Sequence, residues 1–385
     1  MTASLPLSGL VVVELGTSVA APMGAQALAL LGAEVIKIES PRGDDARTWG
    51  PPFVGEDSAI FVAANRNKRS AIIDFKDATQ CETLRRFIVA RADVVLQNLR
   101  PGTVEKHGLD ATALRAAKPS LIYCNLAAFG STGPLMDKPG YDPLMQAFGG
   151  IMSITGEEGR PPVRVAPSIV DQGAGMWAVI GILSALHRRT QTGEGCTVGT
   201  SLYETALNWV AMHAASFVAS GKVPRRMGTE NWGIAPYKAY EASDGWIVIA
   251  AGNDNLFARF AQAIGHPEWK DDPAFRTNAE RVANRERLNA LIAADIRTAT
   301  REVWLTKLDD AGVPCAPMLA LDEVLAHPQS KAVGMLQSAP SGTGIPLIGV
   351  PLEFDGKRPP LQRNSPALGE ATDMVTAPAT KSAAE

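Results

Sequence analysis

The chain has 385 residues, more than one hydrophobic core usually holds, so we expect two domains or a large domain with a smaller one inserted. Hydrophobic residues make up 46% and charged residues 20%, as in ordinary globular enzymes, and a formal net charge of -3 argues against a nucleic-acid-binding surface or an attraction to anionic membranes. The four cysteines are far apart and form no CxxC pair or Cys/His cluster, which argues against a disulfide framework and against a metal site.

The N-terminal residues lack the basic start and the apolar run of a secretory signal. The most apolar stretch, 176–186, is shorter than the ~20 residues that cross a bilayer. We therefore expect a cytoplasmic protein without a membrane partner.

Residues 10–15 (LVVVEL) form a short apolar run, which is typical of a buried parallel strand. A helix is predicted from Pro22 to a stop at Gly32, and a strand follows at 34–39. The same alternation continues with strands at 70–75, 93–97 and 121–126 and a helix at 80–90. Strands that alternate with helices predict an α/β fold, with a parallel sheet covered by helices on both faces.

A Gly- and Pro-rich loop at 130–143 opens the rest of the chain. Predicted elements then follow in the order helix 171–189, helix 202–219, a hairpin of 237–240 and 246–251, helical segments within 255–311, strand 313–318 and helix 321–326. Because the character of the chain changes after Gly221, we predict a smaller α/β domain at 222–325. The large domain then comprises 1–221 and 326–365, and the Ala/Thr/Pro-rich tail 366–385 is expected to be flexible.

Several common catalytic motifs are missing from this sequence. The turn after the first strand, 16–25 (GTSVAAPMGA), lacks the GxGxxG spacing of a dinucleotide-binding enzyme. GxSxG, the P-loop and HExxH are also absent, and the five histidines are scattered. The sequence therefore gives no motif that favours a nicotinamide enzyme, a hydrolase, a nucleoside triphosphatase or a zinc peptidase.

Basic residues recur close to the ends of the predicted strands. They are Arg42, Lys68, Arg69, Lys76, Arg100 and Lys106. In an open α/β sheet the loops beyond the strand ends line the ligand crevice, so these cations could hold a polyphosphate and a ribose phosphate. The alternative is that they only decorate loops that face solvent.

Asp171 lies where a short extended run meets a long apolar helix. Its carboxylate suits an N-cap, because it can accept hydrogen bonds from the first free N–H groups of the helix, and that position favours the ionised form that a nucleophile requires. Gly173 and Gly175 weaken the helix by about 1 kcal/mol each relative to Ala, and the close approach of a ligand to the backbone is one reason for them. A plain cap and a nucleophile both remain open on the residues alone.

Seven segments along nearly the whole chain together resemble one family. They are VVVELGTSVAAPMGAQALALLGAEVIKIESPRGDDAR, ANRNKRSAIIDFK, DVVLQNLRPG, GYDPLMQAFGG, SIVDQGAGMWAVIGILSAL, APYKAYEASDGWIVIAAGN and AGVPCAPMLALDEVLAHPQ. In order and spacing they are similar to the class III CoA-transferases, also known as the CaiB/BaiF or formyl-CoA transferase-like family. The resemblance implies a Rossmann-like large domain built from both chain ends, a smaller α/β domain between them, an interlocked homodimer and an active site between domains.

The resemblance also implies the roles of particular residues. Asp171 takes the place of the family's nucleophile, which forms an aspartyl-CoA thioester, and CoA is a substrate without any permanently bound cofactor. The expected CoA contacts, with Arg42 added from the basic set, are Val19, Ala20, Ser40, Arg42, Ile73, Asp74, Phe75, Lys76, Asn98, Leu99, Arg100, Lys106, Lys138, Gly140, Tyr141 and Asp142. Backbone N–H groups in the glycine-containing loops could stabilise the oxyanions.

The choice of acid is less clear from the resemblance. Formyl-CoA transferases carry glutamine at the position of Val19 and a glycine-rich loop where this chain has MGTENWG, so the chain is closer to the branch that takes succinyl-CoA and a dicarboxylate. The candidate acceptor contacts are Arg47, Trp49, Gly228 and Thr229. Arg47, Arg225 or Arg226 could hold a distal carboxylate, or each is a surface charge.

Two other functions stay open. The family also contains α-methylacyl-CoA racemases, whose histidine falls where this chain has Tyr141, a poor proton-transfer group with an ordinary pKa near 10. The other alternative is a non-catalytic CoA-binding protein. A labelled CoA donor separates the three, because the label moves between acids, an α-proton exchanges with solvent, or neither occurs.

Overall fold

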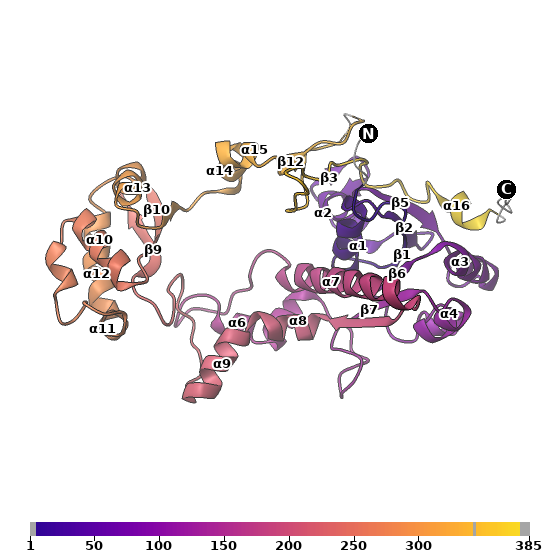
Figure 1. The fold of residues 1–385 in the computed structure, drawn as a ribbon, viewed down its shortest axis with the longest axis horizontal. Helices are drawn as coiled ribbons and strands as arrows, with labels where there is room; N and C mark the ends of the chain where they lie inside the picture. Colours follow the sequence, from indigo (N-terminus) through magenta and orange to yellow (C-terminus); the bar gives the residue numbers. More distant parts are fainter. Residues whose placement is uncertain (1–4, 342–343, 378–385) are drawn as a thin grey trace. The chain divides into compact units, whose positions relative to one another are not determined.

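The computed structural model describes residues 5–341 and 344–377 (Figure 1). The described chain divides into two compact units. The large unit comprises the residues up to Ile151, Arg164–Gly221 and the residues from Pro328 onward, and the small unit comprises Met152–Val163 and Lys222–His327.

Residues 152–163 join the small unit, although the sequence assigns them to the large domain. The reason is a pair of contacts with the segment that follows Gly221. The backbone N–H of Gly228 donates to the carbonyl of Gly156 at 2.8 Å. The guanidinium of Arg225 forms an ion pair with Glu158, also at 2.8 Å.

A six-stranded parallel sheet with the order β5-β2-β1-β6-β7-β8 forms the centre of the large unit. Its strands are β1 (Val11–Leu15), β2 (Glu34–Glu39), β5 (Lys68–Ile72), β6 (Val94–Gln97), β7 (Ile122–Ala127) and β8 (Thr197–Ser201). The sequence predicts all of them but β8, whose residues TVGTS are mostly small or polar. The strand order reverses between β1 and β6, and ligands of open α/β sheets bind beyond the carboxyl ends of the strands at such a reversal.

Helices cover both faces of this sheet, as the alternation predicts (Figure 1). α1 (Ala20–Leu30) and α7 (Ile169–Thr192) lie on one face, where Val12 of β1 joins their buried side chains. α3 (Ala78–Arg91) and α4 (Ala111–Ala117) lie on the other, with Val11 and Val13. Side chains alternate along a strand, so β1 supplies both cores.

α7 is long and apolar enough to cross a membrane when only length and composition are considered. Its buried side chains, among them Ala174, Ala178 and Ile182, pack in the same core as those of α1. The apolar character of α7 therefore reflects its place inside the domain.

The remaining elements of the large unit are short. They are η1 (Asp45–Thr48), β3 (Phe53–Val54), β4 (Asp57–Ser58), α2 (Ala59–Ala64), η2 (Glu105–His107), α5 (Asp142–Phe148), α8 (Leu202–Trp209), α9 (Ala211–Ser220), α15 (Pro328–Ala332), β12 (Leu336–Gln337), β13 (Leu347–Ile348) and α16 (Thr372–Thr376); α6 (Ile151–Ile154) bridges the two units. The single helix expected at 202–219 is two helices, because Val210 at φ -95° and ψ 8° leaves the helical path.

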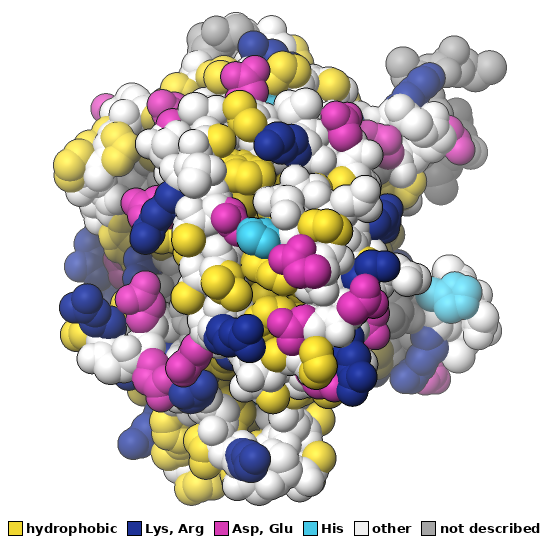
Figure 2. Space-filling view, turned by 90° about the vertical axis from the view of Figure 1, so that its left-hand side faces the viewer, with side chains coloured by type: hydrophobic (Ala, Val, Ile, Leu, Met, Phe, Trp, Pro, Cys, Tyr) yellow, Lys and Arg dark blue, Asp and Glu magenta, His cyan; other side chains and the backbone are white. Residues whose placement is uncertain are grey.

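The small unit has its own antiparallel sheet and core. Its elements are β9 (Tyr237–Ala242), β10 (Gly245–Ala250), α10 (Asp254–Ile264), η3 (Pro267–Lys270), α11 (Asn278–Ala283), α12 (Arg285–Ile296), α13 (Arg301–Asp310), β11 (Cys315–Pro317) and α14 (Leu321–Ala326). The predicted hairpin is confirmed, with Gly245 opposite Ala242. On the face drawn in Figure 2, basic and acidic side chains are interspersed among apolar ones, in keeping with the small net charge of -3.

The C-terminal segment is more ordered than its composition suggests. The expected flexible tail 366–385 includes α16, whose Val375 is 2% exposed among the side chains that pack under α3. The N–H of Ala371 also donates to Ser70 O of β5 at 2.8 Å. Residues 378–385 lie outside the described residues.

Candidate active site

α7 begins at Ile169, so Asp171 lies in its first turn and is not the N-cap that the sequence predicts. The N-cap residue is Ser168, whose side chain makes no capping hydrogen bond. The free N–H groups instead donate to a distant carboxylate: Val170 N and Asp171 N reach Asp142 Oδ2 at 2.8 and 3.3 Å. The cap is therefore Asp142, and the Asp171 carboxylate is left free for another role.

A glutamine holds Asp142 in this position. Asp142 is 2% exposed, and its other oxygen, Oδ1, accepts a hydrogen bond from Gln146 Nε2 at 2.6 Å. Gln146 is itself fixed by both backbone groups of Val165, at 2.8 and 3.1 Å. Both Asp142 oxygens thus accept hydrogen bonds within the protein, and the CoA contact expected of this residue stays a prediction.

Gln146 is a site residue that the sequence does not predict. The available signal was an Asp and a Gln four residues apart on a predicted short helix, a spacing at which the two side chains pair. Only the fold shows that this pair reaches the start of α7.

The pKa of Asp171 is raised from 3.8 to about 7, first by burial and then by the negative charge of Asp142. Among the described residues, none donates a hydrogen bond to its carboxylate. The expectation that a place at the helix N-terminus keeps Asp171 fully ionised is therefore wrong: the neighbouring N–H groups are already bound to Asp142. A carboxylate that is poorly solvated and poised near neutral pH is a candidate nucleophile.

The close packing of α7 against α1 and α8 gives a structural reason for the glycines of α7. A Cβ at Gly175 would lie 2.8 Å from Ala20 O and 3.0 Å from Gly24 N of α1. A Cβ at Gly173 would lie 2.8 Å from Thr205 and from Trp209 of α8. Asp171 is one turn, about 6 Å along the axis, before the residue that touches Ala20. The start of α7 is thus held beside the start of α1.

Most expected CoA contacts collect at the carboxyl edge of four neighbouring strands. Val19 and Ala20 follow β1, Ser40 and Arg42 follow β2, Ile73, Asp74, Phe75 and Lys76 follow β5, and Asn98, Leu99 and Arg100 follow β6. Lys106 on η2 is near the residues that follow β5, because its neighbour His107 stacks on Phe75 with ring centroids 5.8 Å apart. Lys138, Gly140 and Tyr141 lie between β7 and α5.

Burial separates the cations of this set. Arg42, Lys76, Arg100, Lys106 and Lys138 are exposed. Lys68 is 0% exposed and forms an ion pair with Glu14, so it is a buried structural charge and not a phosphate contact. Burial lowers the pKa of Lys68 to about 8, although Glu14 opposes the change. Ile73 is also 0% exposed, and its N–H donates to Glu39 O at 2.9 Å.

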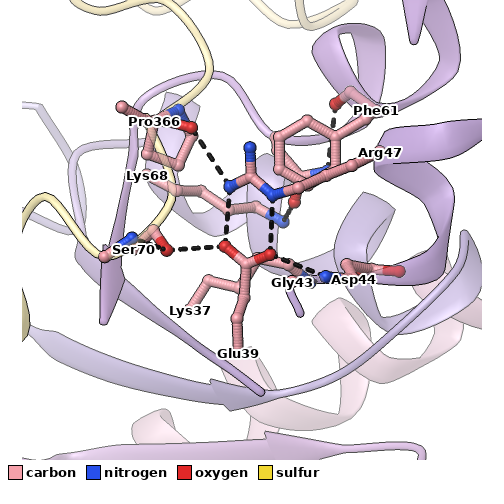
Figure 3. Close-up of polar contacts among 12 residues, drawn as sticks. Lys37, Glu39, Gly43, Asp44, Arg47, Phe61, Lys68, Ser70 and Pro366 are labelled. Carbon is pink, nitrogen blue, oxygen red and sulfur yellow. Dashed lines mark hydrogen bonds and ion pairs between the residues drawn. The ribbon is translucent and has the colours of Figure 1, made fainter. Parts of the chain in front are cut away.

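Arg47, an expected acceptor contact, is already fully engaged (Figure 3). Its guanidinium contacts both oxygens of Glu39, at 2.7 and 2.8 Å, and Asp57 at 2.8 Å. It also lies over the ring of Phe61 and donates to Pro366 O. Because two carboxylates neutralise it, Arg47 is not available to bind the carboxylate of a substrate.

The other acceptor candidates belong to both units. Trp49 is 37% exposed and follows η1. Gly228 and Thr229 belong to the small unit, where Thr229 Oγ1 accepts from Ala239 N at 3.1 Å. Arg225 pairs with Glu158, whereas one buried nitrogen of Arg226 has no hydrogen-bond partner among the described residues.

Comparison with known proteins gives the family directly. Residues 7–372 match the family described as CoA-transferase family III. The chain belongs to this family. A succinate–glutarate CoA-transferase of Agrobacterium fabrum is 36% identical to it over 381 residues, which cover 97% of this chain and 95% of that protein. An acetyl-CoA:oxalate CoA-transferase of Acetobacter aceti is 37% identical, over 95% of this chain and 93% of that one.

A solved structure agrees with the sequence relatives. A CaiB/BaiF family protein from Brucella suis matches with a TM-score of 0.86 and 41% identity, over 97% of this chain and 99% of that one. The chain is therefore a class III CoA-transferase with an α/β fold around a large parallel sheet, and these sequence predictions are confirmed.

Proposed function

We propose that this enzyme moves CoA from succinyl-CoA to a small dicarboxylic acid, with Asp171 as the covalent nucleophile. The observation that carries the role of Asp171 is its half-buried carboxylate, which has no hydrogen-bond donor among the described residues and is fixed at the start of α7 by the cap from Asp142. The names of the two relatives suggest the acids: succinate and glutarate for one, and oxalate, with acetyl-CoA as the thioester, for the other; succinate, glutarate and oxalate are dicarboxylates.

The reaction needs no net proton transfer. A carboxylate oxygen of Asp171 attacks the donor thioester carbonyl, the C–S bond breaks, and a mixed anhydride and CoA thiolate result. The thiolate attacks the aspartyl carbonyl, which expels the donor acid and leaves an aspartyl-CoA thioester. The acceptor carboxylate attacks that thioester and releases the thiolate again. Attack of the thiolate on the acceptor carbonyl then yields the new acyl-CoA and restores Asp171.

CoA is proposed to bind at the carboxyl edge of β5, β2, β1 and β6. Exposed cations there, Arg42, Lys76, Arg100 and Lys106, suit its phosphates. Because Gly175 of α7 contacts Ala20 of α1, this edge and Asp171 belong to one region of the large unit.

We further propose that the chain is an interlocked homodimer in the cytoplasm. None of the ten residues of α9 is buried, and Met212 and Val218 are 76% and 82% exposed. An apolar helix that is exposed in the single chain often marks a surface for association with a second chain.

Light scattering at micromolar concentration should give a dimer, and a Met212→Lys variant should weaken the dimer. A stable wild-type monomer would contradict the proposal.

The transfer activity is tested with purified enzyme, succinyl-CoA and a panel of short mono- and dicarboxylates that includes formate, oxalate and glutarate. We expect a dicarboxylate to give the highest kcat/KM. The preference is wrong if formate or another monocarboxylate is the best acceptor. Incubation with acyl-CoA and no acceptor should add CoA to the peptide that contains Asp171, and hydroxylamine should remove it as the hydroxamate.

A further inference from the structure

Four charged side chains form a continuous chain of ion pairs inside the large unit, next to the loop that joins β1 to α1. Lys68 pairs with Glu14 at 2.7 Å, Glu14 with Lys37 at 2.9 Å, and Lys37 with Asp44 at 2.8 Å. The first three residues are 0% exposed and Asp44 is 3% exposed. We refer to these four residues as the buried ion-pair chain; Figure 3 labels Lys37, Asp44 and Lys68.

Three members of the buried ion-pair chain also hold the backbone of the loop and of the first turn of α1. The contacts are Lys37 Nζ to Gly16 O at 2.7 Å, Lys68 Nζ to Pro22 O at 2.8 Å, and Ser18 N to Asp44 Oδ1 at 3.0 Å. The Asn98 side chain adds two bonds: Thr17 N donates to Asn98 Oδ1 at 2.9 Å, and Asn98 Nδ2 donates to Thr17 O at 3.0 Å. Side chains from β2, β5 and the segments after β2 and β6 therefore fix one short loop from several sides.

The loop adopts a conformation that a free chain avoids. Ser18 has φ 68°, in the left-handed region that non-glycine residues rarely occupy. Such a conformation is strained and persists only where the surroundings enforce it. The bond from Ser18 N to Asp44 supplies that constraint at the strained residue itself.

Stability alone does not account for the buried ion-pair chain. Removing charges from water is expensive, and apolar residues of similar size often stabilise a core as well or better. A charged chain that also donates to backbone carbonyls specifies a geometry that apolar side chains cannot.

We propose that Glu14, Lys37, Asp44 and Lys68 are positioning residues, which fix the backbone at 16–20 in the conformation that receives CoA without touching the substrate. This rests on the proposed function, in which Val19 and Ala20 contact CoA. Through the contact of Ala20 with Gly175, the same loop lies beside the start of the helix that carries Asp171.

A neighbouring cluster provides a matched control. Ser70 Oγ donates to Glu39 Oε1 at 2.6 Å, and Gly369 N donates to Ser70 Oγ at 3.0 Å (Figure 3). Ser70 is fully buried, as Lys68 is, but the hydrogen bonds of its side chain lead to Glu39 and the C-terminal segment, and none of them reaches the loop directly. Ser70→Ala therefore removes a buried polar contact from the same sheet without releasing 16–20.

The experiment compares Lys68→Met, the double variant Glu14→Gln/Lys68→Met, and Ser70→Ala. The double variant removes both members of the terminal pair, so that no lone buried charge prevents folding. Hydrogen exchange of the peptide that covers 16–23 measures the loop directly. Steady-state kinetics with acyl-CoA give KM and kcat.

We expect exchange of the loop amides to be about tenfold faster or more in both Lys68 variants, because a buried bond to a charged group is lost. KM for acyl-CoA should rise about tenfold with a smaller change in kcat, and Ser70→Ala should change neither readout. Loop exchange at the wild-type rate in the folded variants overturns the proposal. Faster exchange with an unchanged KM supports the positioning role and shows instead that the loop is not the CoA contact assumed in the proposed function.

Discussion

Asp171→Asn separates the chemical role of this carboxylate from its cost to the fold. An amide is far too weak a nucleophile, so the variant should lose nearly all transfer activity. Its effect on stability follows from the pKa. Folding raises that pKa from 3.8 to about 7, which means that the folded state binds the proton more tightly than the unfolded state.

The sign of the effect is fixed by this difference. Below pH ~4 Asp171 is protonated in the folded and the unfolded state and does not lower the free energy of unfolding. The loss of stability begins as the pH rises above this value and is complete above about pH 7. A difference between 3.8 and about 7 corresponds to about 4 kcal/mol at full ionisation, and solvent around the partly exposed side chain reduces it, so we expect about 2 to 4 kcal/mol. Asn carries no charge and avoids this penalty.

The assay is urea unfolding of wild type and Asp171→Asn at pH 5 and pH 8, at one protein concentration. The variant should be clearly the more stable at pH 8, and its advantage should shrink at pH 5. Asp110→Asn is the control, because Asp110 is a true N-cap that accepts from Thr112 N and Ala113 N, and Asn caps about as well. If Asp171→Asn is no more stable than wild type at pH 8, the assigned burial penalty is wrong; if it retains substantial turnover, Asp171 is not the nucleophile.

Two further predictions concern the surroundings of the site. Asp142→Asn removes the charge that helps to raise the pKa of Asp171, so the acidic limb of the kcat/KM profile should move to lower pH, and an unmoved limb would contradict the coupling. Arg100→Ala and Lys106→Ala should weaken CoA binding in a calorimetric titration, more strongly at low salt, because exposed charges are screened by ions. Arg86→Ala, which removes an exposed arginine paired with Glu82 on α3, is the control. Equal affinity in all three variants would remove Arg100 and Lys106 from the site.

The sequence predicts the sheet well because its signal is local. The apolar runs at β1 and β2 and the turn residues between elements identify the strands without knowledge of their neighbours. The paired residues of β9 and β10 are likewise close in the chain. β8 is missed because its residues TVGTS carry no apolar run, and its place at the sheet edge depends on β7.

The site is predicted less well because its contacts join distant residues. Asp171 has the composition signal of a cap, yet the capping oxygen belongs to Asp142 on another helix. Lys68 and Arg69 are adjacent in β5 and look alike in the sequence, but they point to opposite faces of the sheet. Lys68 is buried with Glu14, whereas Arg69 pairs with Glu34 where both are partly exposed. Which face is closed is a property of the fold, so sequence alone cannot divide buried structural cations from those that can meet a phosphate.

The contact between α1 and α7 leads to a last prediction, Gly175→Ala. Alanine improves helix propensity by about 1 kcal/mol, and an isolated helix would become more stable. In the fold, however, the new Cβ would lie 2.8 Å from Ala20 O and 3.0 Å from Gly24 N, and both are backbone atoms that cannot rotate away. α7 must therefore shift away from α1, which moves Asp171 relative to the loop at 16–20. Because a displacement of ~1 Å at a reacting group can lower a rate about a hundredfold, we expect a large loss of kcat with little change in CoA affinity. Gly199→Ala, where a Cβ meets nothing within 4 Å, is the control and should keep wild-type kcat. Wild-type kcat in Gly175→Ala would mean that the close packing of the two helix starts does not set the geometry of transfer.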